Sequence, residues 1–485
     1  MNAYHKKNYF YLMLILATTL CAYALLSNIP FLYYEVVGIE QNPKLIDDSL
    51  FWQSYFNFRG LFYKPLSLLS YHLNHGLCGP SSVCFHWTNF FIHLANVVLI
   101  FFLSKKIGLK HFVFCTLFFA LHPLATACVS QIHGRPYALG SFFMLLALNF
   151  NFSNFNKKTE KYRSVYLNLG IVFLFFCMFL SKQSFIIFPL IFLFHSWNTI
   201  NSKQKTYLYI SLTTLCLCFL IGIFYLDIVP NISKAIVSPK IYLISQLGNA
   251  LTLIQFYFFP FQTALVHDLY FYASVFYLEV MTGILLLTLW IFLIVKHRSS
   301  LLGWLFFSFL FMIIPTNSII PKNEVIREWR LYPSLIFLSL LWAYGLDYID
   351  ARLKCLPIKK GFKYFILYVP LMLYSILQLS TVYKQNQIYT DPILAWQQVT
   401  QHYPYSSDAY NNIGVWYARQ KNYKTAQIYF KKAISLDPKN FAYELNMAAC
   451  YREMQQPALN RKHTAIAKKK ASVYNNRSHS FHLKP

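Results

Sequence analysis

Long apolar segments alternate with short polar or basic ones from the N-terminus to about residue 383. A helix needs about 20 apolar residues to cross a bilayer, and about eleven of these segments reach or approach that length. They cover residues 9–27, 85–103, 110–127, 137–152, 165–181, 184–197, 207–226, 274–295, 301–315, 331–347 and 363–382. Residues 1–383 are therefore predicted to form an all-α, polytopic bundle of transmembrane helices.

Clusters of lysine and arginine between the apolar segments set the expected orientation, because cytoplasmic loops carry an excess of these residues. Lys6 and Lys7 place the N-terminus in the cytoplasm, and the later basic clusters fall on the same side only if the apolar stretch 241–262 makes no net crossing. We expect that stretch to lie in the interface or to re-enter the membrane. The first loop (residues 28–85) and the C-terminal part then share one extracytoplasmic face.

The composition also indicates a membrane protein, since 56% of the 485 residues are hydrophobic and only 12% are charged. A water-soluble protein of this length could not bury so much apolar surface. The net charge of +26 does not indicate a nucleic-acid partner, because the basic residues form short clusters rather than one continuous face. Basic residues also crowd into residues 457–485, which we expect to form a solvated, partly disordered tail.

Acidic residues are scarce, and four of the 17 in the chain lie in the first loop: Glu35, Glu40, Asp47 and Asp48. A carboxylate at the outer end of a helical bundle can act as a general base. Glu35 is the candidate for that role, and its alternative is an ordinary interfacial carboxylate. Asp47 and Asp48 are expected to be solvated or to cap helices.

His86, Asn89 and His93 recur at helical spacing, so they share one face of the predicted second span. They could be metal ligands, but no acid at helical spacing completes a site, so a hydrogen-bonded structural cluster is the favoured interpretation. The cysteines show no CxxC pair or zinc spacing, and we predict no metal and no cofactor. Cys78 and Cys84 could pair if their loop faces an oxidising compartment.

Beyond residue 383 the hydrophobicity falls, and residues 384–456 carry a helical repeat. The tetratricopeptide pattern of about 34 residues is met at each of its signature positions. These are Tyr410, Gly414, Tyr417, Ala426, Phe430, Ala433 and Pro438. Small residues in the pattern let two helices approach closely, and a helix at 391–402 is expected to cap the front. Because so short an array is marginal alone, we expect it to rest on the membrane domain or on a protein partner.

The order of these motifs resembles that of the TMTC-type O-mannosyltransferases and their bacterial relatives, polytopic GT-C glycosyltransferases that end in tetratricopeptide repeats. The resemblance covers nearly the whole chain, and its specificity comes from the order and spacing of the pieces. The matching pieces are residues 31–43 (FLYYEVVGIEQNP), 63–66 (YKPL), His86 with Asn89 and His93, 122–135 (HPLATACVSQIHGR), Ser181 and Lys182 within LSKQS, 259–268, and 328–334 (EWRLYPS).

The resemblance implies a GT-C fold and transfer of a hexose such as mannose from a polyprenyl-phosphate carrier to a protein or envelope-glycan acceptor outside the cytoplasm. Glu35 would deprotonate the acceptor hydroxyl, and fixed cations would bind the leaving phosphate. The residues expected to bind the donor phosphate or substrate are Arg135, Lys182, Arg327, Arg330, His86 and His133. The implied partners are the lipid-linked sugar, its acceptor, the bilayer and a protein at the repeat.

Several of the cations also have a structural alternative. Arg135, at the mouth of a span, could be a snorkelling interface residue. One of Arg327 and Arg330 could pair with Glu328 while the other holds phosphate, or all three could form a salt-bridged loop. Lys182 lies on the outer face against the positive-inside trend, and this placement favours a functional role.

Three acids that the family usually has are missing, which leaves the activity open. Tyr34 and Glu35 stand where an Asp pair is usual, and Ala127 and Gln183 occupy positions that often carry Glu. The alternative function is therefore a catalytically inactive, membrane-anchored repeat scaffold for protein interactions. A transporter is a third hypothesis, but one half of the sequence does not repeat the other.

The transferase hypothesis predicts that four side chains converge on one extracytoplasmic cavity open to lipid: Glu35, Arg135, Lys182 and Arg330. The scaffold hypothesis predicts no such convergence. The short repeat array fits the bacterial relatives, and so an inner membrane protein with a cytoplasmic N-terminus and a periplasmic repeat. A protein of the endoplasmic reticulum would have the same topology.

Overall fold

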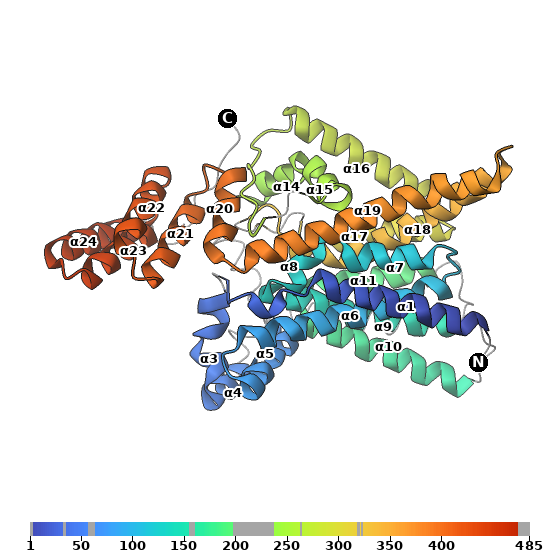
Figure 1. Ribbon diagram of the computed structural model, residues 1–485, viewed down its shortest axis with the longest axis horizontal. Helices are drawn as coiled ribbons and strands as arrows, with labels where there is room; N and C mark the ends of the chain where they lie inside the picture. Colours follow the sequence, from blue (N-terminus) through green and yellow to red (C-terminus); the bar gives the residue numbers. More distant parts are fainter. Residues whose placement is uncertain are drawn as a thin grey trace.

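The computed structural model describes residues 3–32, 35–56, 64–154, 161–196, 237–261, 264–317, 321 and 324–473. These residues form helices joined by turns, and no β-strand element occurs among them, so the all-α prediction is confirmed. Most of the long helices run along one direction, and the C-terminal helices extend from one end of this bundle (Figure 1).

The membrane domain begins with α1 and a first loop that contains short helices. Its elements up to the start of the second long helix are α1 (Ala3–Ala22), η1 (Leu26–Asn28), η2 (Val36–Glu40), α3 (Pro43–Ile46), α4 (Asp48–Phe56) and α5 (Pro65–Cys78). The central elements are α6 (Ser82–Lys106), α7 (Phe112–Leu121), η3 (Pro123–Ala125), α8 (Thr126–Val129), η4 (Ile132–Gly134), α9 (Arg135–Asn154), α10 (Lys161–Ser181), η5 (Gln183–Ile187) and α11 (Phe188–Ser196).

The second half of the membrane domain leads into the C-terminal helices without a long linker. Its elements are α14 (Pro239–Gly248), α15 (Ala250–Phe258), α16 (Leu278–Lys296), α17 (Leu301–Ile313), η6 (Glu328–Leu331), α18 (Tyr332–Cys355) and α19 (Lys360–Tyr389). The C-terminal helices are α20 (Pro392–His402), α21 (Ser407–Arg419), α22 (Tyr423–Leu436), α23 (Phe441–Glu453) and α24 (Pro457–Val473).

Five helices in the described part of the chain are long and apolar enough to cross a membrane: Lys6–Asn28, Ser82–Lys106, Leu278–Lys296, Glu328–Cys355 and Lys360–Tyr389. Phe112–Leu121 and Pro123–Val129 make a sixth if this pair, bent by 51°, is counted as one span. The multi-pass character is thus confirmed. Three more of the predicted spans correspond to shorter apolar helices in the described residues, Leu169–Ser181, Gln183–Phe194 and Leu301–Ile313, and segment 207–226 lies outside the described residues.

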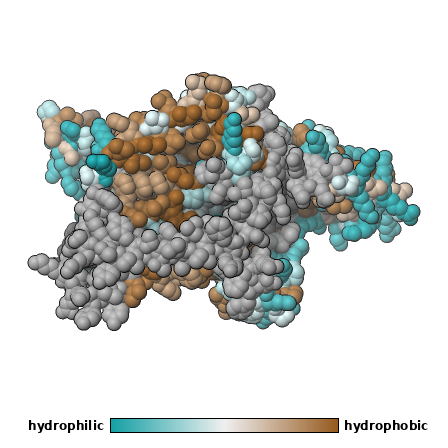
Figure 2. Space-filling view, turned by 180° about the vertical axis from the view of Figure 1, so that it is seen from behind, coloured by the Kyte–Doolittle hydropathy of each residue, from teal (hydrophilic) through white to brown (hydrophobic). Residues whose placement is uncertain are grey.

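The surface of the bundle agrees with a membrane environment. Figure 2 shows a broad hydrophobic band over the bundle, with hydrophilic residues at one end and over the C-terminal helices at the other. The stretch 241–262, expected not to cross, forms α14 and α15, which have ten and nine residues. Each is too short to span a bilayer alone.

The first loop packs against the bundle. Asp47 accepts a hydrogen bond from the backbone N–H of Leu50 at 2.8 Å and so stabilises the start of α4, the capping role expected for it. Cys78 and Cys84 form a disulfide that joins the end of α5 to the start of α6. The open question of their pairing is thereby answered, and α5 is held beside α6.

Helices α21 and α22 pack as the tetratricopeptide pattern predicts. Phe430 and Ala433 of α22 are buried, and Ala426 is buried beside them. A Cβ atom added at Gly414 would lie 2.7 Å from the Phe430 ring, so only glycine allows this close approach without a shift of that ring. Tyr417 stacks on Tyr429 with their ring centroids 5.4 Å apart.

The basic segment after residue 456 corrects one prediction, because it begins with a packed helix rather than a disordered tail. Helix α24 packs on α23, where Glu444 is held by His463 at 2.7 Å and by Lys470 at 2.6 Å. His463 also stacks on Tyr451. The second repeat is therefore a complete helix pair, with basic residues on one helix paired to a buried carboxylate of the other. Residues 474–485 lie outside the described part.

The repeat domain is docked on the membrane domain at the end where the first loop lies (Figure 1). One apolar cluster joins Tyr23, just after α1, and Phe90 of α6 to Trp396 of α20 and Ile413 of α21. Trp416 packs partly against the cluster of the first loop. The expectation that a short array needs a supporting surface is met by the protein's own bundle.

We expect Gly414→Ala to destabilise the repeat domain by about 1–3 kcal/mol, the usual cost of overpacking a core, because its Cβ meets the Phe430 ring. The control is Gly345→Ala on α18, where an added Cβ has no heavy atom within 4 Å. Alanine is also the better helix former, so this variant should be neutral or slightly stabilised. Limited proteolysis and thermal unfolding of the full chain in detergent measure the stability of both variants. Equal losses in the two variants would contradict the packing argument.

Candidate active site

A small pocket lies where the first loop, the middle of the bundle and the repeat domain meet. It is lined by Leu32, Glu35, Gln131, His133, Leu265, Val266, Arg327, Trp329 and Trp396. Among these described lining residues Glu35 is the one carboxylate. The pocket therefore combines one acid, one arginine and one histidine with a largely apolar wall, a composition typical of sites that bind and orient organic ligands.

Backbone groups fix the position of Glu35. Its two carboxylate oxygens accept hydrogen bonds from the N–H of Leu32, at 2.9 Å, and from the N–H of Ile132. Burial raises the pKa of Glu35 to about 8, and the N–H donors and the Arg135 charge oppose this rise only in part. A carboxyl group with such a pKa changes its protonation state near neutral pH, as a general base does.

His133 reaches the same pocket from a tightly packed turn. It belongs to η4, where a Cβ on the neighbouring Gly134 would lie 2.1 Å from the carbonyl oxygen of Ala127. Only glycine fits there, and this contact holds η4 against α8. Burial lowers the pKa of the His133 imidazole to about 3, with smaller contributions from Lys64 and Arg327. His133 is therefore neutral at physiological pH.

Lys64 and Lys182 form a second group of charges beside the pocket. The hydroxyl of Ser67, in the first turn of α5, donates to the carbonyl of Ser181 at 3.0 Å and so brings the two lysines into one region. Burial, with the charges of Lys64 and Arg330, lowers the pKa of Lys182 to about 7. Burial likewise lowers the pKa of Lys64 to about 8.

The two arginines before α18 complete this group, but their acidic partner differs from the one proposed from the sequence. Glu324 accepts from Arg327 at 2.5 Å and from Arg330 at 3.2 Å. Glu328, the expected partner, is instead bonded to His267 at 2.6 Å. We call the set Lys64, Lys182, Arg327 and Arg330 the cation cluster. It has four cations, and among the residues that the structure describes Glu324 is the acid paired with them.

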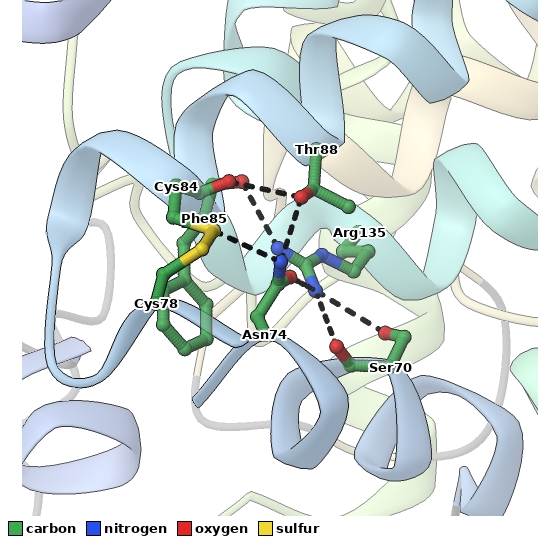
Figure 3. The surroundings of a disulfide bond; sticks show 7 residues. All are labelled: Ser70, Asn74, Cys78, Cys84, Phe85, Thr88 and Arg135. Atoms are coloured by element: carbon green, nitrogen blue, oxygen red, sulfur yellow. Dashed lines mark hydrogen bonds between the residues drawn. A yellow bond between two sulfur atoms is a disulfide. The ribbon is translucent and has the colours of Figure 1, made fainter. Parts of the chain in front are cut away.

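The contacts of Arg135 favour a structural role over the phosphate-binding role expected from the sequence. It is fully buried, and its guanidinium stacks over the rings of Tyr71 and Phe85. It donates to four residues of α5 and α6, as Figure 3 shows in part: Asn89 at 2.6 Å, Ser70 at 3.1 Å, Asn74 at 2.5 Å and the carbonyl of Phe85 at 2.9 Å. These donors are used inside the protein, so Arg135 holds the first loop rather than a ligand.

The shared helical face of His86, Asn89 and His93 is buried in the bundle, and none of the three lines the pocket. Asn89 binds Arg135, while His93 contacts the hydroxyl of Tyr332 at 2.8 Å. The structural interpretation of this face is supported for Asn89 and His93. His86, proposed as a substrate ligand, lies away from the pocket because it faces the helix packing.

The predicted convergence is therefore partial. Glu35, His133 and Arg327 line one pocket, and Lys182 and Arg330 belong to the adjacent cation cluster, whereas Arg135 and His86 serve the fold. Lys64, Glu324 and Trp396 were not assigned to a site from the sequence. Lys64 lies in the YKPL piece and could have been chosen on that signal; nothing in the sequence pointed to the other two.

Comparisons with known proteins agree with the motifs. Residues 407–440 match the family model of the tetratricopeptide repeat, so that prediction is confirmed. The chain is 32% identical over 130 residues to protein O-mannosyl-transferase TMTC2 of Mus musculus, a match that covers 24% of this chain and 16% of that protein. It is 37% identical over 87 residues to human protein O-mannosyl-transferase TMTC3, covering 18% of this chain and 9% of that protein.

The matches thus span under a fifth of the length of these relatives, and they confirm the resemblance to TMTC-type proteins over that part. Among solved structures, ArnT from Cupriavidus metallidurans in the apo state is 13% identical with a TM-score of 0.43, covering 85% of this chain and 81% of ArnT. The same protein bound to undecaprenyl phosphate is 15% identical with a TM-score of 0.42, covering 83% and 80%.

We expect Arg135→Met to destabilise the protein by about 3–5 kcal/mol, because breaking a buried charged network leaves its acceptors unpaired. Arg352→Met on the exposed end of α18 is the matched control and should change stability by less than about 0.5 kcal/mol. Thermal unfolding is measured in detergent without any donor. Under these conditions a residue that holds the fold changes the stability, whereas a residue that only binds the donor phosphate does not. A variant as stable as the wild type would restore Arg135 as a ligand candidate.

Proposed function

We propose that this protein is a membrane glycosyltransferase that moves a hexose from a polyprenyl-phosphate donor to a hydroxyl group of a protein acceptor. The observation that carries the proposal is the buried Glu35 carboxyl group in a pocket that borders the cation cluster. The curated relatives, which are protein O-mannosyl-transferases, support mannose as the sugar and protein as the acceptor. An envelope glycan is the alternative acceptor.

Glu35 would act as the general base. Backbone N–H groups of Leu32, Ile132 and His133 bond to its carboxylate, and because two carboxylate oxygens offer about four lone-pair sites, a site remains for an acceptor hydroxyl. As the hydroxyl oxygen attacks the anomeric carbon, its proton passes to Glu35 and the bond between the sugar and the phosphate oxygen breaks. The electron pair of that bond leaves with the polyprenyl phosphate.

The cation cluster would stabilise the leaving phosphate. Lys64 and Lys182 are desolvated, and this strengthens their attraction for an anion once they are protonated. Arg327 and Arg330 supply guanidinium groups, whose planar set of donors matches phosphate oxygens and is shared in part with Glu324. In this arrangement Arg327 belongs both to the cation cluster and to the pocket, because it also lines the pocket.

The same proposal orients the protein in its membrane. The disulfide of Cys78 and Cys84 suits an oxidising compartment, which supports an extracytoplasmic first loop. Lysines at the end of α6 and the start of α19 support a cytoplasmic opposite end. We assign the pocket and the repeats to the periplasmic face of an inner membrane, or to the lumen of the endoplasmic reticulum in a eukaryotic cell.

We expect Glu35→Gln to lower sugar transfer by about 10²- to 10⁴-fold, because glutamine keeps the shape of the side chain but cannot take the proton. Transfer is measured with the purified protein, a radiolabelled polyprenyl-phosphate hexose and peptides that contain serine and threonine. At saturating donor, the wild-type rate should rise with pH through about 8, where half of Glu35 has lost its proton, and level off at higher pH.

Glu40→Gln, five residues further along the same loop, is the control and should leave the rate and its pH profile unchanged. Transfer by the wild type that Glu35→Gln retains would remove Glu35 from the mechanism. If the wild type transfers no sugar from any donor, the scaffold function takes the place of the transferase.

Donor binding should weaken as the pH rises above about 7, because the bound phosphate needs a protonated Lys182 and the empty site holds that lysine at a pKa of about 7. Below this pH the ammonium group is already present, while above it each binding event must take up a proton. A polyprenyl phosphodiester has no ionisation of its own in this range. Binding of a fluorescent donor analogue between about pH 6 and pH 9 measures the effect.

Lys182→Met should bind the analogue more weakly at low pH and show a flatter dependence on pH. Retention of the full wild-type dependence in this variant would show that another group binds the phosphate.

A further inference from the structure

The wall of the pocket is incomplete without the repeat domain. Trp396 lies on α20, the helix in front of the first repeat, and it is 1% exposed. It lines the pocket together with residues of the first loop and of the bundle, including Glu35. The helix that begins the repeat domain is therefore part of the same pocket as the candidate base.

The junction that holds this wall is a chain of buried polar contacts. The hydroxyl of Tyr403, just after α20, bonds to Nδ1 of His267 at 2.9 Å, and Nε2 of His267 bonds to Glu328 at 2.6 Å. Tyr405 donates to the carbonyl of Asp268 at 2.7 Å. Segment 265–268, which supplies Leu265 and Val266 to the pocket, is thus tied to the repeat domain on one side and to η6 on the other.

The helix before α20 also contributes to this wall. Gln131, a lining residue, donates to the hydroxyl of Tyr389 at the end of α19 at 2.9 Å. Ser130 bonds to Asn386 at 2.5 Å. The end of α19 and the start of the repeat domain are therefore fixed with respect to Glu35, so that a ligand in the pocket meets a preformed surface.

The charges divide the site into two sides. Lys64, Lys182 and Arg330 do not line this pocket, and they form the side suited to a phosphate. The pocket itself is lined by Leu32, Leu265, Val266, Trp329 and Trp396 besides its few polar groups. An aliphatic and aromatic wall around one carboxyl group suits a short peptide with a hydroxyl side chain better than a glycan, whose many hydroxyl groups need hydrogen-bond partners.

We propose that Trp396 and helix α20 form the acceptor side of the site, so that the repeat domain selects a serine- or threonine-containing polypeptide. This inference rests on the proposed function and adds the position at which the acceptor binds. Trp396 is a specificity-determining residue in this arrangement, since it contacts the peptide and not the reacting sugar.

The first test compares Trp396→Ala, Trp396→Phe and Tyr451→Phe in the full-length protein. Trp396→Ala should raise KM for the peptide by about ten- to thirtyfold, as expected for truncation of a buried aromatic contact, with KM for the donor unchanged. Trp396→Phe keeps most of the packing and should raise the peptide KM by less than about threefold. Tyr451→Phe, on the same domain but outside the pocket, should match the wild type.

Trp396→Ala could instead change kcat, both KM values and thermal stability together. If Trp396→Phe does not restore them, Trp396 serves the fold alone and the proposal is overturned. An unchanged peptide KM in a folded Trp396→Ala variant would overturn it as well.

The second test does not depend on turnover. Serine- and threonine-containing peptides that carry a benzophenone are crosslinked to the wild-type protein, and the attachment sites are mapped by mass spectrometry. Crosslinks on α20 that unlabelled peptide suppresses support the acceptor site, even if the protein transfers no sugar and the transferase function fails. Sugar transfer without any crosslink on α20 would overturn the acceptor site while leaving the transferase function in place.

Discussion

The buried guanidinium of Arg135 is the constraint on which the rest of the site depends. A charge without water is tolerated only where hydrogen bonds replace its hydration, and here the acceptors come from α5 and α6. Satisfying Arg135 therefore fixes the first loop against the start of α9. Ile132, three residues before Arg135, donates its N–H to Glu35, so the same arrangement positions the candidate base.

A second consequence concerns the way distant parts of the chain build one pocket. Its residues come from the first loop, from the turn before α9, from the segments before α16 and α18, and from the repeat domain. Such a pocket exists only when all of these parts are docked. The docking in turn supplies the apolar contacts that a short repeat array lacks alone. Stability of the repeat and completeness of the pocket are thus coupled through α20.

The sequence was sufficient for the features that depend on local pattern. Apolar segments and repeat spacing predicted a helical bundle with a tetratricopeptide pair, and a scarce acid pointed to Glu35. Sequence could not tell whether a cation keeps free donors, so Arg135 was assigned to a ligand although its donors are consumed inside the protein. Nor could it choose between Glu324 and Glu328, because the irregular segment before α18 has no periodicity to set which acid meets the arginines.

The absence of the Asp pair expected from the resemblance is compatible with the proposed site because of how the remaining charges are balanced. Glu35 with a pKa of about 8 and Lys182 with a pKa of about 7 are both close to neutral when the site is empty. Burying few charges keeps the cost of desolvation low. An arriving phosphate brings the negative charge that favours the protonated lysine. A second carboxylate beside Glu35 would raise its pKa further and weaken the attraction for the anion, so a single acid suits this cation cluster.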